Sequence, residues 1–175
     1  MNIQTNAADL VMVSVLGQVA NPSLSGLPAE PYRLDSDGKA FLWPTFGGIV
    51  YNVTIGDSAF GWAGDCIHPS VSIAHSDPNK NRGLNIFSCV GNEAMIVSGR
   101  AKGARGVVTG KSGRFSDQVI IHFDLETRRK IAIDDKIIIK SEGVGMSAPD
   151  RPEVALKSLS PKLFNALPKR VEGQV

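Results

Sequence analysis

The chain has 175 residues, of which 42% are hydrophobic and 21% charged, and its formal net charge is +2. This length supports one substantial core or two small barrels without disulfide bonds, and the composition is that of a globular protein. The chain has no run of eighteen apolar residues and no basic leader at its start. We therefore expect neither a membrane span nor a secretory signal, and we expect a cytoplasmic location.

Cysteine usage and charge distribution narrow the function classes. Cys66 and Cys89 are the only cysteines and do not form a C-x-x-C pair, so neither a disulfide framework, a redox pair nor a zinc ribbon is predicted. Residues 1–95 contain four Lys/Arg against eight Asp/Glu, whereas residues 96–175 contain fifteen against nine. An acidic first part and a basic second part are consistent with different partners, and also with plain solvated surfaces.

The first half of the chain predicts strands separated by loops. The apolar run Leu10–Val19 predicts a buried strand, and the Pro- and Gly-containing segment 20–38 predicts a loop that crosses the surface. Apolar and other side chains alternate over residues 49–55, which predicts a strand with one buried face. The run Gly83–Val90 predicts a further strand that ends before Gly91.

In the second half, short strands and glycine turns alternate over residues 95–113, and strands are predicted at Gln118–Phe123 and within 131–140. Strands this short cannot bury both faces unless the sheet curls. The pattern therefore predicts a closed five-stranded barrel over residues 95–142. Ser160 as N-cap and Pro161 at the first helical position predict a short helix after the barrel.

The segment Gly47–Ile73 concentrates side chains that bind metals or move protons. Asp65 and His68 are three residues apart and would reach one cation from a loop, with Glu93 or Asp57 as the third ligand. A divalent metal is the cofactor that such a set predicts. The alternative is that Asp65 accepts backbone N–H bonds within its own turn and that His68 is exposed.

A small-molecule site on this loop, with metal-assisted and hydrolase-like chemistry, is the leading functional hypothesis. The predicted catalytic residues, which we expect in one cleft, are Asp57, Asp65 and Glu93. The predicted ligand-binding residues are Trp62, Asn92 and Cys66. Structural roles are the alternative for these: Trp62 would pack in the core, and Asn92 and Glu93 would cap the following turn. No catalytic signature with fixed spacing is present, so enzymatic activity is left open.

The run VSGRAKGARGVV at residues 97–108 resembles the KOW motif of ribosomal proteins and transcription factors. In that motif a strand, a Gly-x-x-Lys-Gly turn and a Gly-x-Val strand begin a small Src-homology-3-like barrel. The matching positions are Gly99, Lys102, Gly103, Gly106 and Val108. Glycine suits the tight turns because it reaches positive φ at little cost. The resemblance implies a barrel and contacts with RNA or with other proteins.

The basic side chains of this KOW-like turn support the rival hypothesis, a nucleic-acid or ribonucleoprotein binding module. The predicted polyanion-binding residues are Arg100, Lys102, Arg105, Lys111 and Arg114. If aligned on one face, they would bind phosphate backbones weakly and in a salt-dependent manner. Only Phe115 is available nearby for base stacking. A solvated loop surface without a ligand is the alternative.

Three separated blocks are similar to the family called domain of unknown function 4438. They are GGIVYNVTIGDSAFGWAGD at 47–65, SCVGNEA at 88–94 and SGRAKGARGVVTG at 98–110. The resemblance implies a β-rich fold and a shared loop, without an established activity. It carries over Asp57, Trp62, Asp65, Asn92 and Glu93 more firmly than Cys66 and His68. It also implies that family members continue into a second region that this chain lacks.

Taken together, these patterns predict a mostly β protein with one or two small packed barrels, the second Src-homology-3-like, and little helix. The expected division is an N-terminal β module at 1–93, a KOW-like barrel at 94–143 and a C-terminal tail with a short helix at 144–175. The expected partner is a small molecule, with nucleic acid as the alternative and no membrane. A homo-oligomer or a missing C-terminal region is left open.

Overall fold

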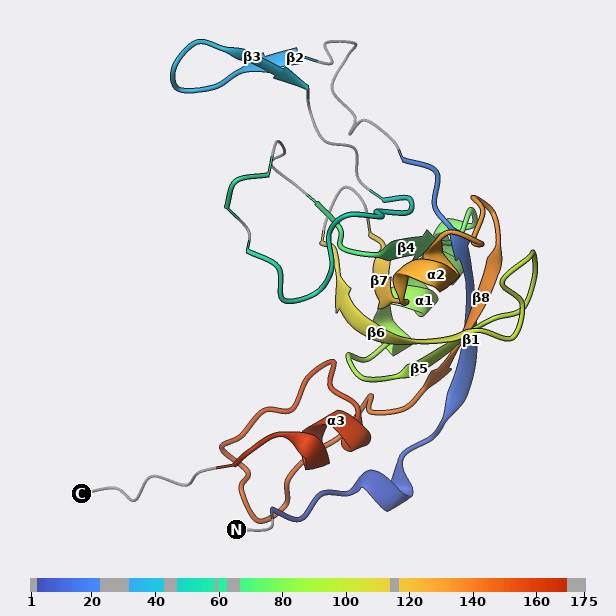
Figure 1. Ribbon diagram of the computed structural model, residues 1–175. Coiled ribbons are helices and arrows are strands. Elements are labelled where there is room, and N and C mark those ends of the chain that lie inside the picture. Colours follow the sequence, from blue (N-terminus) through green and yellow to red (C-terminus); the bar gives the residue numbers. More distant parts are fainter. Residues whose placement is uncertain are drawn as a thin grey trace.

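The computed structural model describes residues 3–22, 32–42, 47–58, 60–62, 67–113 and 117–169. Six antiparallel strands form one closed barrel in the order β1-β4-β7-β6-β5-β8 (Figure 1). These strands are β1 (Val13–Val19), β4 (Val71–Ala74), β5 (Glu93–Ile96), β6 (Arg105–Lys111), β7 (Val119–His122) and β8 (Lys136–Ser141). The prediction of a mostly β fold with a small barrel is confirmed.

The barrel interior is filled by branched aliphatic side chains that alternate along each strand. In β8, Ile137 and Ile139 are fully buried while Ile138 between them is partly exposed. Val119 and Ile121 follow the same alternation in β7. Each such side chain contributes about 1.5–3 kcal/mol by leaving water, so the interior rows determine which face of each strand points inward.

The barrel crosses the predicted domain boundary near residue 93, which corrects the expected five-stranded barrel over 95–142. β1 pairs with β8 over six residue pairs, from Val13 opposite Ser141 to Gln18 opposite Lys136. β4 pairs with both β1 and β7. Strands β5–β8 alone would leave the edges of β7 and β8 unpaired, and the two N-terminal strands supply the missing hydrogen bonds. Strands β1 and β4, which come from residues 1–93, are therefore part of the same barrel as β5–β8.

The predicted strand at Gly83–Val90 is wrong, because residues Pro78–Phe87 form helix α1. The side chain of Asp77 caps this helix by accepting backbone N–H bonds from Asn79 at 2.8 Å and Lys80 at 3.0 Å. The pKa of Asp77 is lowered, and the hydrogen bond from the Lys80 backbone is the largest cause. Leu84 is the buried residue of α1. An Asp-Pro pair is a helix-start signal, and here it decides the structure over the short apolar run.

The predicted strand over residues 49–55 is also wrong beyond its first residue. Ile49 makes an isolated bridge with Val71, and the chain then turns away from the sheet. Tyr51 and Ile55 are 50% and 51% exposed, whereas Val53 is only 7% exposed. One buried side chain is too few to hold a strand on the barrel. The alternation of apolar and polar residues over 49–55 therefore does not correspond to a buried and an exposed face of a strand.

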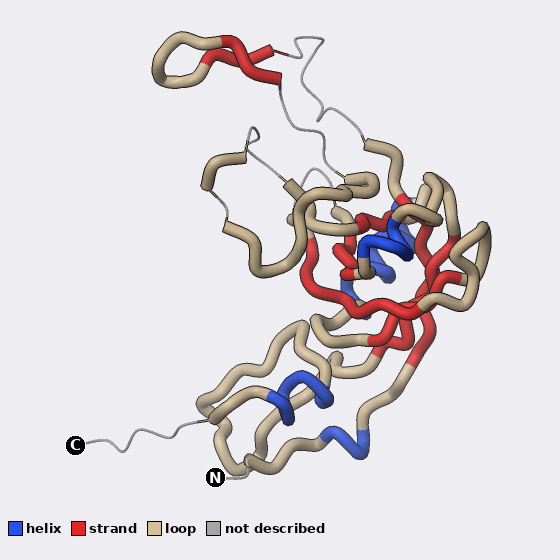
Figure 2. Tube along the Cα trace, viewed as in Figure 1, coloured by secondary structure: helices blue, strands red, loops and turns tan. Residues whose placement is uncertain are grey.

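The remaining elements surround the barrel. β2 (Tyr32–Leu34) and β3 (Ala40–Leu42) form a separate two-stranded sheet that stands away from it (Figure 1). The helices are η1 (Ala7–Asp9), α2 (Leu125–Arg128) and α3 (Pro161–Ala166), all short (Figure 2). The predicted start of α3 is confirmed, since Ser160 Oγ accepts the Leu163 N–H at 3.1 Å. In the part of the chain that the structure describes, no helix has the length and apolar character needed to cross a membrane.

Candidate functional site

A cleft of about 450 Å³ lies where the outer face of the barrel meets the segment that carries α3, and we call it the β5–α3 cleft. Strands β5, β6, β7 and β8 contribute to its lining, and Lys162 comes from α3. The volume falls within the range of about 300–1,000 Å³ that is usual for small-molecule pockets. The residues that form it come from distant parts of the chain.

One row of side chains crosses this face of the barrel. Lys140 pairs with Glu93, Glu93 pairs with Val107, and Val107 pairs with His122. Directly paired residues point to the same side of a sheet, so these four share the outer face. Neighbouring strands are about 4.8 Å apart, which places the backbones of Glu93 and His122 about 10 Å from each other. Val107, 37% exposed, forms an apolar floor between them.

Charges of both signs surround this floor. The acidic side chains that line the cleft are Glu93, Asp124 and Glu142, and the basic ones are Arg105, Lys140 and Lys162. Arg105 Nη1 forms an ion pair with Glu93 Oε1, and both side chains are at least half exposed. Exposed pairs of this kind contribute little to stability, so the pair is free to exchange one partner for a ligand group.

His122 lines the cleft, and one of its ring nitrogens is buried. Its Nδ1 is buried and makes no hydrogen bond to the described residues. Since Nδ1 is buried and has no hydrogen-bond partner among the described residues, Nε2 is the ring nitrogen available to a ligand in the cleft.

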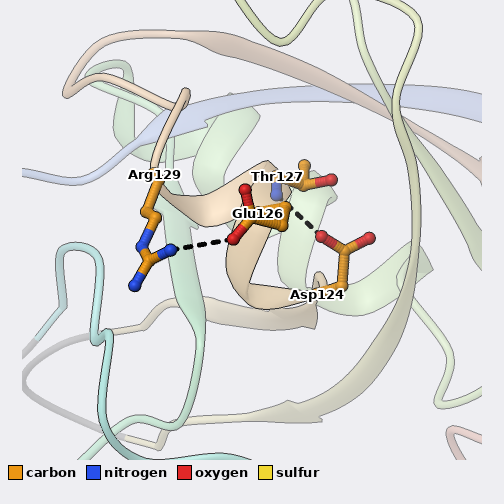
Figure 3. Close-up of polar contacts among 4 residues, drawn as sticks. All are labelled: Asp124, Glu126, Thr127 and Arg129. Atoms are coloured by element: carbon orange, nitrogen blue, oxygen red, sulfur yellow. Dashed lines mark hydrogen bonds and ion pairs between the residues drawn. The ribbon is translucent and has the colours of Figure 1, made fainter.

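Asp124 stands at the edge of the cleft because it caps helix α2. Its carboxylate accepts the Thr127 N–H at 2.7 Å, and Arg129 forms an ion pair with Glu126 at 2.8 Å. Figure 3 shows both contacts. The hydrogen bond from the Thr127 backbone is the largest cause that lowers the pKa of Asp124. The cap therefore holds this carboxylate in place and in its ionised form.

Two glycines allow the walls of the cleft to come close together. Gly91 has φ +91°, and a Cβ there would lie 2.4 Å from Ser160 Oγ. A Cβ at Gly106 would lie 2.5 Å from the carbonyl oxygen of His122. The absence of a side chain at Gly91 thus lets the start of α3 pack against it, and its absence at Gly106 lets the backbone of β7 approach closely. The segment before α3 is fixed by the backbone bond from Ser160 N to Val90 O, 2.9 Å long.

Of the two predicted catalytic carboxylates that the structure describes, one lies in this cleft. Glu93 lines it, whereas Asp57 does not. Asp57 Oδ2 accepts the backbone N–H of Thr54 at 2.9 Å, as an aspartate does within its own turn. Asp65 and Cys66, predicted as catalytic and ligand-binding, lie outside the described residues. The expected meeting of Asp57 with Glu93 in one cleft is therefore not found at the β5–α3 cleft.

Two predicted ligand-binding residues have structural partners. Trp62 Nε1 donates to the carbonyl oxygen of Ser58 at 2.8 Å. Asn92 is fully buried, accepts the Cys89 N–H at 2.7 Å and donates to the carbonyl oxygen of Glu142 at 2.8 Å. The role of Asn92 is then to fix the backbone beside the cleft rather than to contact a ligand.

His68, the predicted metal ligand, is buried and not exposed. Its Nδ1 lies 3.0 Å from Ser72 Oγ and 3.2 Å from Gln118 Oε1. Burial lowers the pKa of His68, and the bond with Gln118 offsets this in part. Among the described residues no three His, Cys, Asp or Glu side chains are grouped to hold a metal ion. A metal on Asp65 and His68 stays a prediction, since Asp65 is not described.

The basic residues of the KOW-like turn are spread along the molecule. Arg100 and Lys102 are exposed at the turn between β5 and β6, while Arg105 is paired with Glu93. Lys111 is at the far end of β6, which at about 3.3 Å per residue is about 20 Å long. Arg114 lies outside the described residues. The strand, turn and strand expected here are present, and the KOW-like assignment itself stays a prediction.

Several residues of the cleft were not predicted as site residues: His122, Asp124, Lys140, Glu142 and Lys162. The alternating pattern of β7 does indicate that His122 points outward. Which strands lie beside β7 depends on the strand order of the barrel, and the alternating pattern of one strand does not indicate that order.

Comparison with known proteins agrees with this fold. The family model described as "Domain of unknown function (DUF4438), N-terminal" matches residues 32–165. The chain is 39% identical to a solved structure described as "Crystal structure of TM1086", with a TM-score of 0.89. The similarity covers 97% of this chain and 58% of that one, so this chain spans a little over half of the length of its solved relative. No curated protein matches the chain.

Proposed function

The chain belongs to the family described as "Domain of unknown function (DUF4438), N-terminal", and we propose that it binds a small polar molecule in the β5–α3 cleft. One observation carries the proposal. Three acidic side chains, three basic side chains and His122 surround the exposed Val107 in a single cleft of about 450 Å³. A small apolar floor with convergent polar groups is the usual form of a small-molecule site.

The charge pattern favours a molecule that carries both an acidic and a basic group. An acidic group placed near Arg105, Lys140 or Lys162 meets a cation, and an amino group placed near Asp124 or Glu142 meets a carboxylate. A small zwitterion such as an amino acid fits this description, with its nonpolar part over Val107.

Proton exchange in this cleft would fall to His122 and Glu93. A molecule lying over Val107 reaches both side chains, since they flank that residue on the same face. His122 donates through Nε2, and Glu93 accepts once its pairing with Arg105 is exchanged for the ligand. The hydrolase-like chemistry expected from the sequence would use these two groups rather than the Asp57–His68 loop.

The proposal is tested with a variant that fills the floor of the cleft. Val107→Trp places a bulky ring there, and Val11→Trp is the matched control because Val11 is 79% exposed and does not line the cleft. Each protein is examined by saturation-transfer NMR with a mixture of the twenty amino acids as probe. We expect signals from at least one amino acid with the natural chain and with Val11→Trp, and their loss with Val107→Trp. The absence of any signal with the natural chain, or equal signals with Val107→Trp, would refute the proposal.

Native mass spectrometry with elemental analysis of the natural chain tests the predicted divalent metal, a bound small molecule and the oligomeric state in one experiment. It reports a bound metal, a bound ligand and the number of chains in the assembly. Nucleic-acid binding by the KOW-like turn is the less supported function, because Arg105 and Lys111 lie at opposite ends of β6 and the basic side chains that the structure describes are therefore spread out. Salt-sensitive binding of duplex RNA at about 50 mM salt, reduced in the Lys102→Ala/Arg105→Ala double variant, would support it instead.

A further inference from the structure

A second cavity of about 620 Å³ lies between helix α1 and the end of β6, separate from the β5–α3 cleft. We call it the Lys111 pocket. Asn81, Arg82 and Asn85 line it from α1, Lys111 from β6, and Asp117 and Ser158 from two loops. No residue of this group belongs to the small-molecule site proposed above.

Two hydrogen bonds hold the ammonium group of Lys111 in the pocket, and they use two of its three hydrogens. Its Nζ donates to the carbonyl oxygen of Asn85 at 2.9 Å and to Ser158 Oγ at 2.9 Å. An ammonium group has three hydrogens, so one is left for a further acceptor. The Ser158 hydroxyl accepts from Lys111 and keeps its own hydrogen for donation.

Lys111 has no ion-pair partner in the described part of the chain, although the acidic residue Asp117 lines the same cavity and Cys89 lies near enough to interact with its charge. Both of its acceptors are neutral, and no carboxylate lies within ion-pair distance among the described residues. Partial burial lowers the pKa of Lys111, because the ammonium group is partly removed from water, and the interaction with Cys89 opposes this shift in part. A bound anion would supply the missing ion-pair partner.

Arg82 brings a second cation to the same pocket. It lines the cavity from α1 and is exposed to solvent. Asn81 and Asn85 both donate to the carbonyl oxygen of Asp117, at 3.0 Å and 2.6 Å, and so hold the opposite wall against the helix.

The backbone of the two loops is strained where it borders this cavity. Asp117 has φ 43° and Ser158 has φ 52°, conformations that L-residues other than glycine seldom adopt. Strain of this kind gathers at sites that position a ligand. The backbone strain supports the assignment of a ligand site, and the argument from the charges of Lys111 and Arg82 does not depend on this strain.

We propose that the Lys111 pocket binds the phosphate group of a small molecule, with Lys111 and Arg82 as its cationic anchors and Ser158 as a hydroxyl donor. Two cations match the charge of a phosphate monoester, which is about −1.5 to −2 near neutral pH. A singly charged carboxylate would satisfy only one of them.

Inorganic phosphate is the probe for this site. It is titrated into the natural chain at constant ionic strength, and binding is followed by calorimetry and by the amide NMR shifts of Lys111, Ser112 and Ser158. We expect saturable binding with a dissociation constant of about 1 mM, and shifts confined to this pocket. Acetate, titrated in parallel, should bind at least about tenfold more weakly.

Two variants test the role of the cationic side chains in phosphate binding, and a third is the control. Arg82→Gln and Lys111→Met should each weaken phosphate binding by about tenfold or more, because each removes a charged donor. Lys80→Gln is the matched control, since Lys80 is exposed on the same helix and does not line the pocket. Because Arg82 is exposed, Arg82→Gln should fold normally even if Lys111→Met does not. Absence of phosphate binding, acetate binding of equal strength, or equal weakening by Arg82→Gln and Lys80→Gln would overturn the proposal.

Discussion

Arg128 holds the loop after Gly47 against the barrel, and its replacement should release that loop. The residue is 2% exposed, and its Nη1 donates to the carbonyl oxygens of Val50 at 2.6 Å and Val53 at 3.2 Å. Its Nε is buried without a partner among the described residues. The change Arg128→Met keeps an unbranched apolar stem and removes the guanidinium group with both of its hydrogen bonds.

The magnitude follows from opposing contributions. Hydrogen bonds from a charged donor contribute about 1.5–3 kcal/mol each, so two of them amount to about 3–6 kcal/mol. Removing a buried charge that lacks a carboxylate partner recovers part of this. We therefore expect Arg128→Met to lower the free energy of unfolding by about 2–4 kcal/mol. At a urea dependence of about 2 kcal/mol per molar, the unfolding midpoint falls by about 1–2 M.

Urea denaturation of the natural chain and two variants measures this effect. Arg129→Met is the matched control, because Arg129 is exposed and its pair with Glu126 is a surface pair that contributes about 0–1 kcal/mol. Hydrogen exchange adds a local reading at the amides of Val50 and Ser72, which donate to Ser70 O and Gly48 O. Exchange there should accelerate in Arg128→Met. An unfolding midpoint equal to that of Arg129→Met would refute the reasoning.

The other predictions concern His68 and Gly106. Burial lowers the pKa of His68 below its ordinary 6.5, so the unfolded chain binds this proton more readily and stability should fall as the pH drops below about 6.5, by at most about 1.4 kcal/mol per pH unit. His68→Gln should remove that part of the pH dependence in urea unfolding between pH 5 and 8, and an unchanged pH profile would contradict the assignment. Gly106→Ala should lower the free energy of unfolding by about 1–3 kcal/mol, because its Cβ would lie 2.5 Å from the carbonyl oxygen of His122, and a midpoint equal to that of the natural chain would contradict it.

Local patterns in the sequence determined the barrel strands other than β4, which was not predicted, and the cap of the helix α3. The apolar run before Val19, the glycine turns between β5 and β6 and the Ser160-Pro161 start of α3 each depend on neighbours along the chain. Such signals act over a few residues, so they can be recognised without knowing what packs against them. Asp77-Pro78 is a signal of the same kind, and giving it more weight than the apolar run after it would have predicted α1 correctly.

The strand expected over residues 49–55 does not form because of contacts with residues far away in the sequence. Its alternation is real in the sequence, but only Val53 finds a buried place, and Arg128 from α2 holds the backbone as a loop. The same holds for the predicted site residues. Asp57 was predicted as a catalytic residue and Asn92 as a ligand-binding residue, and each forms a hydrogen bond with the backbone around it.

Only the tertiary structure decided which polar side chains share a cavity. Closure of the barrel through β1 and β4 fixed the register that places Lys140, Glu93, Val107 and His122 in one row. Folding of the C-terminal segment against Gly91 then added Lys162 and formed the cleft. A strand pattern has a period of two residues and indicates which face a side chain occupies, whereas pairing between strands far apart in the chain depends on the summed packing of the whole core.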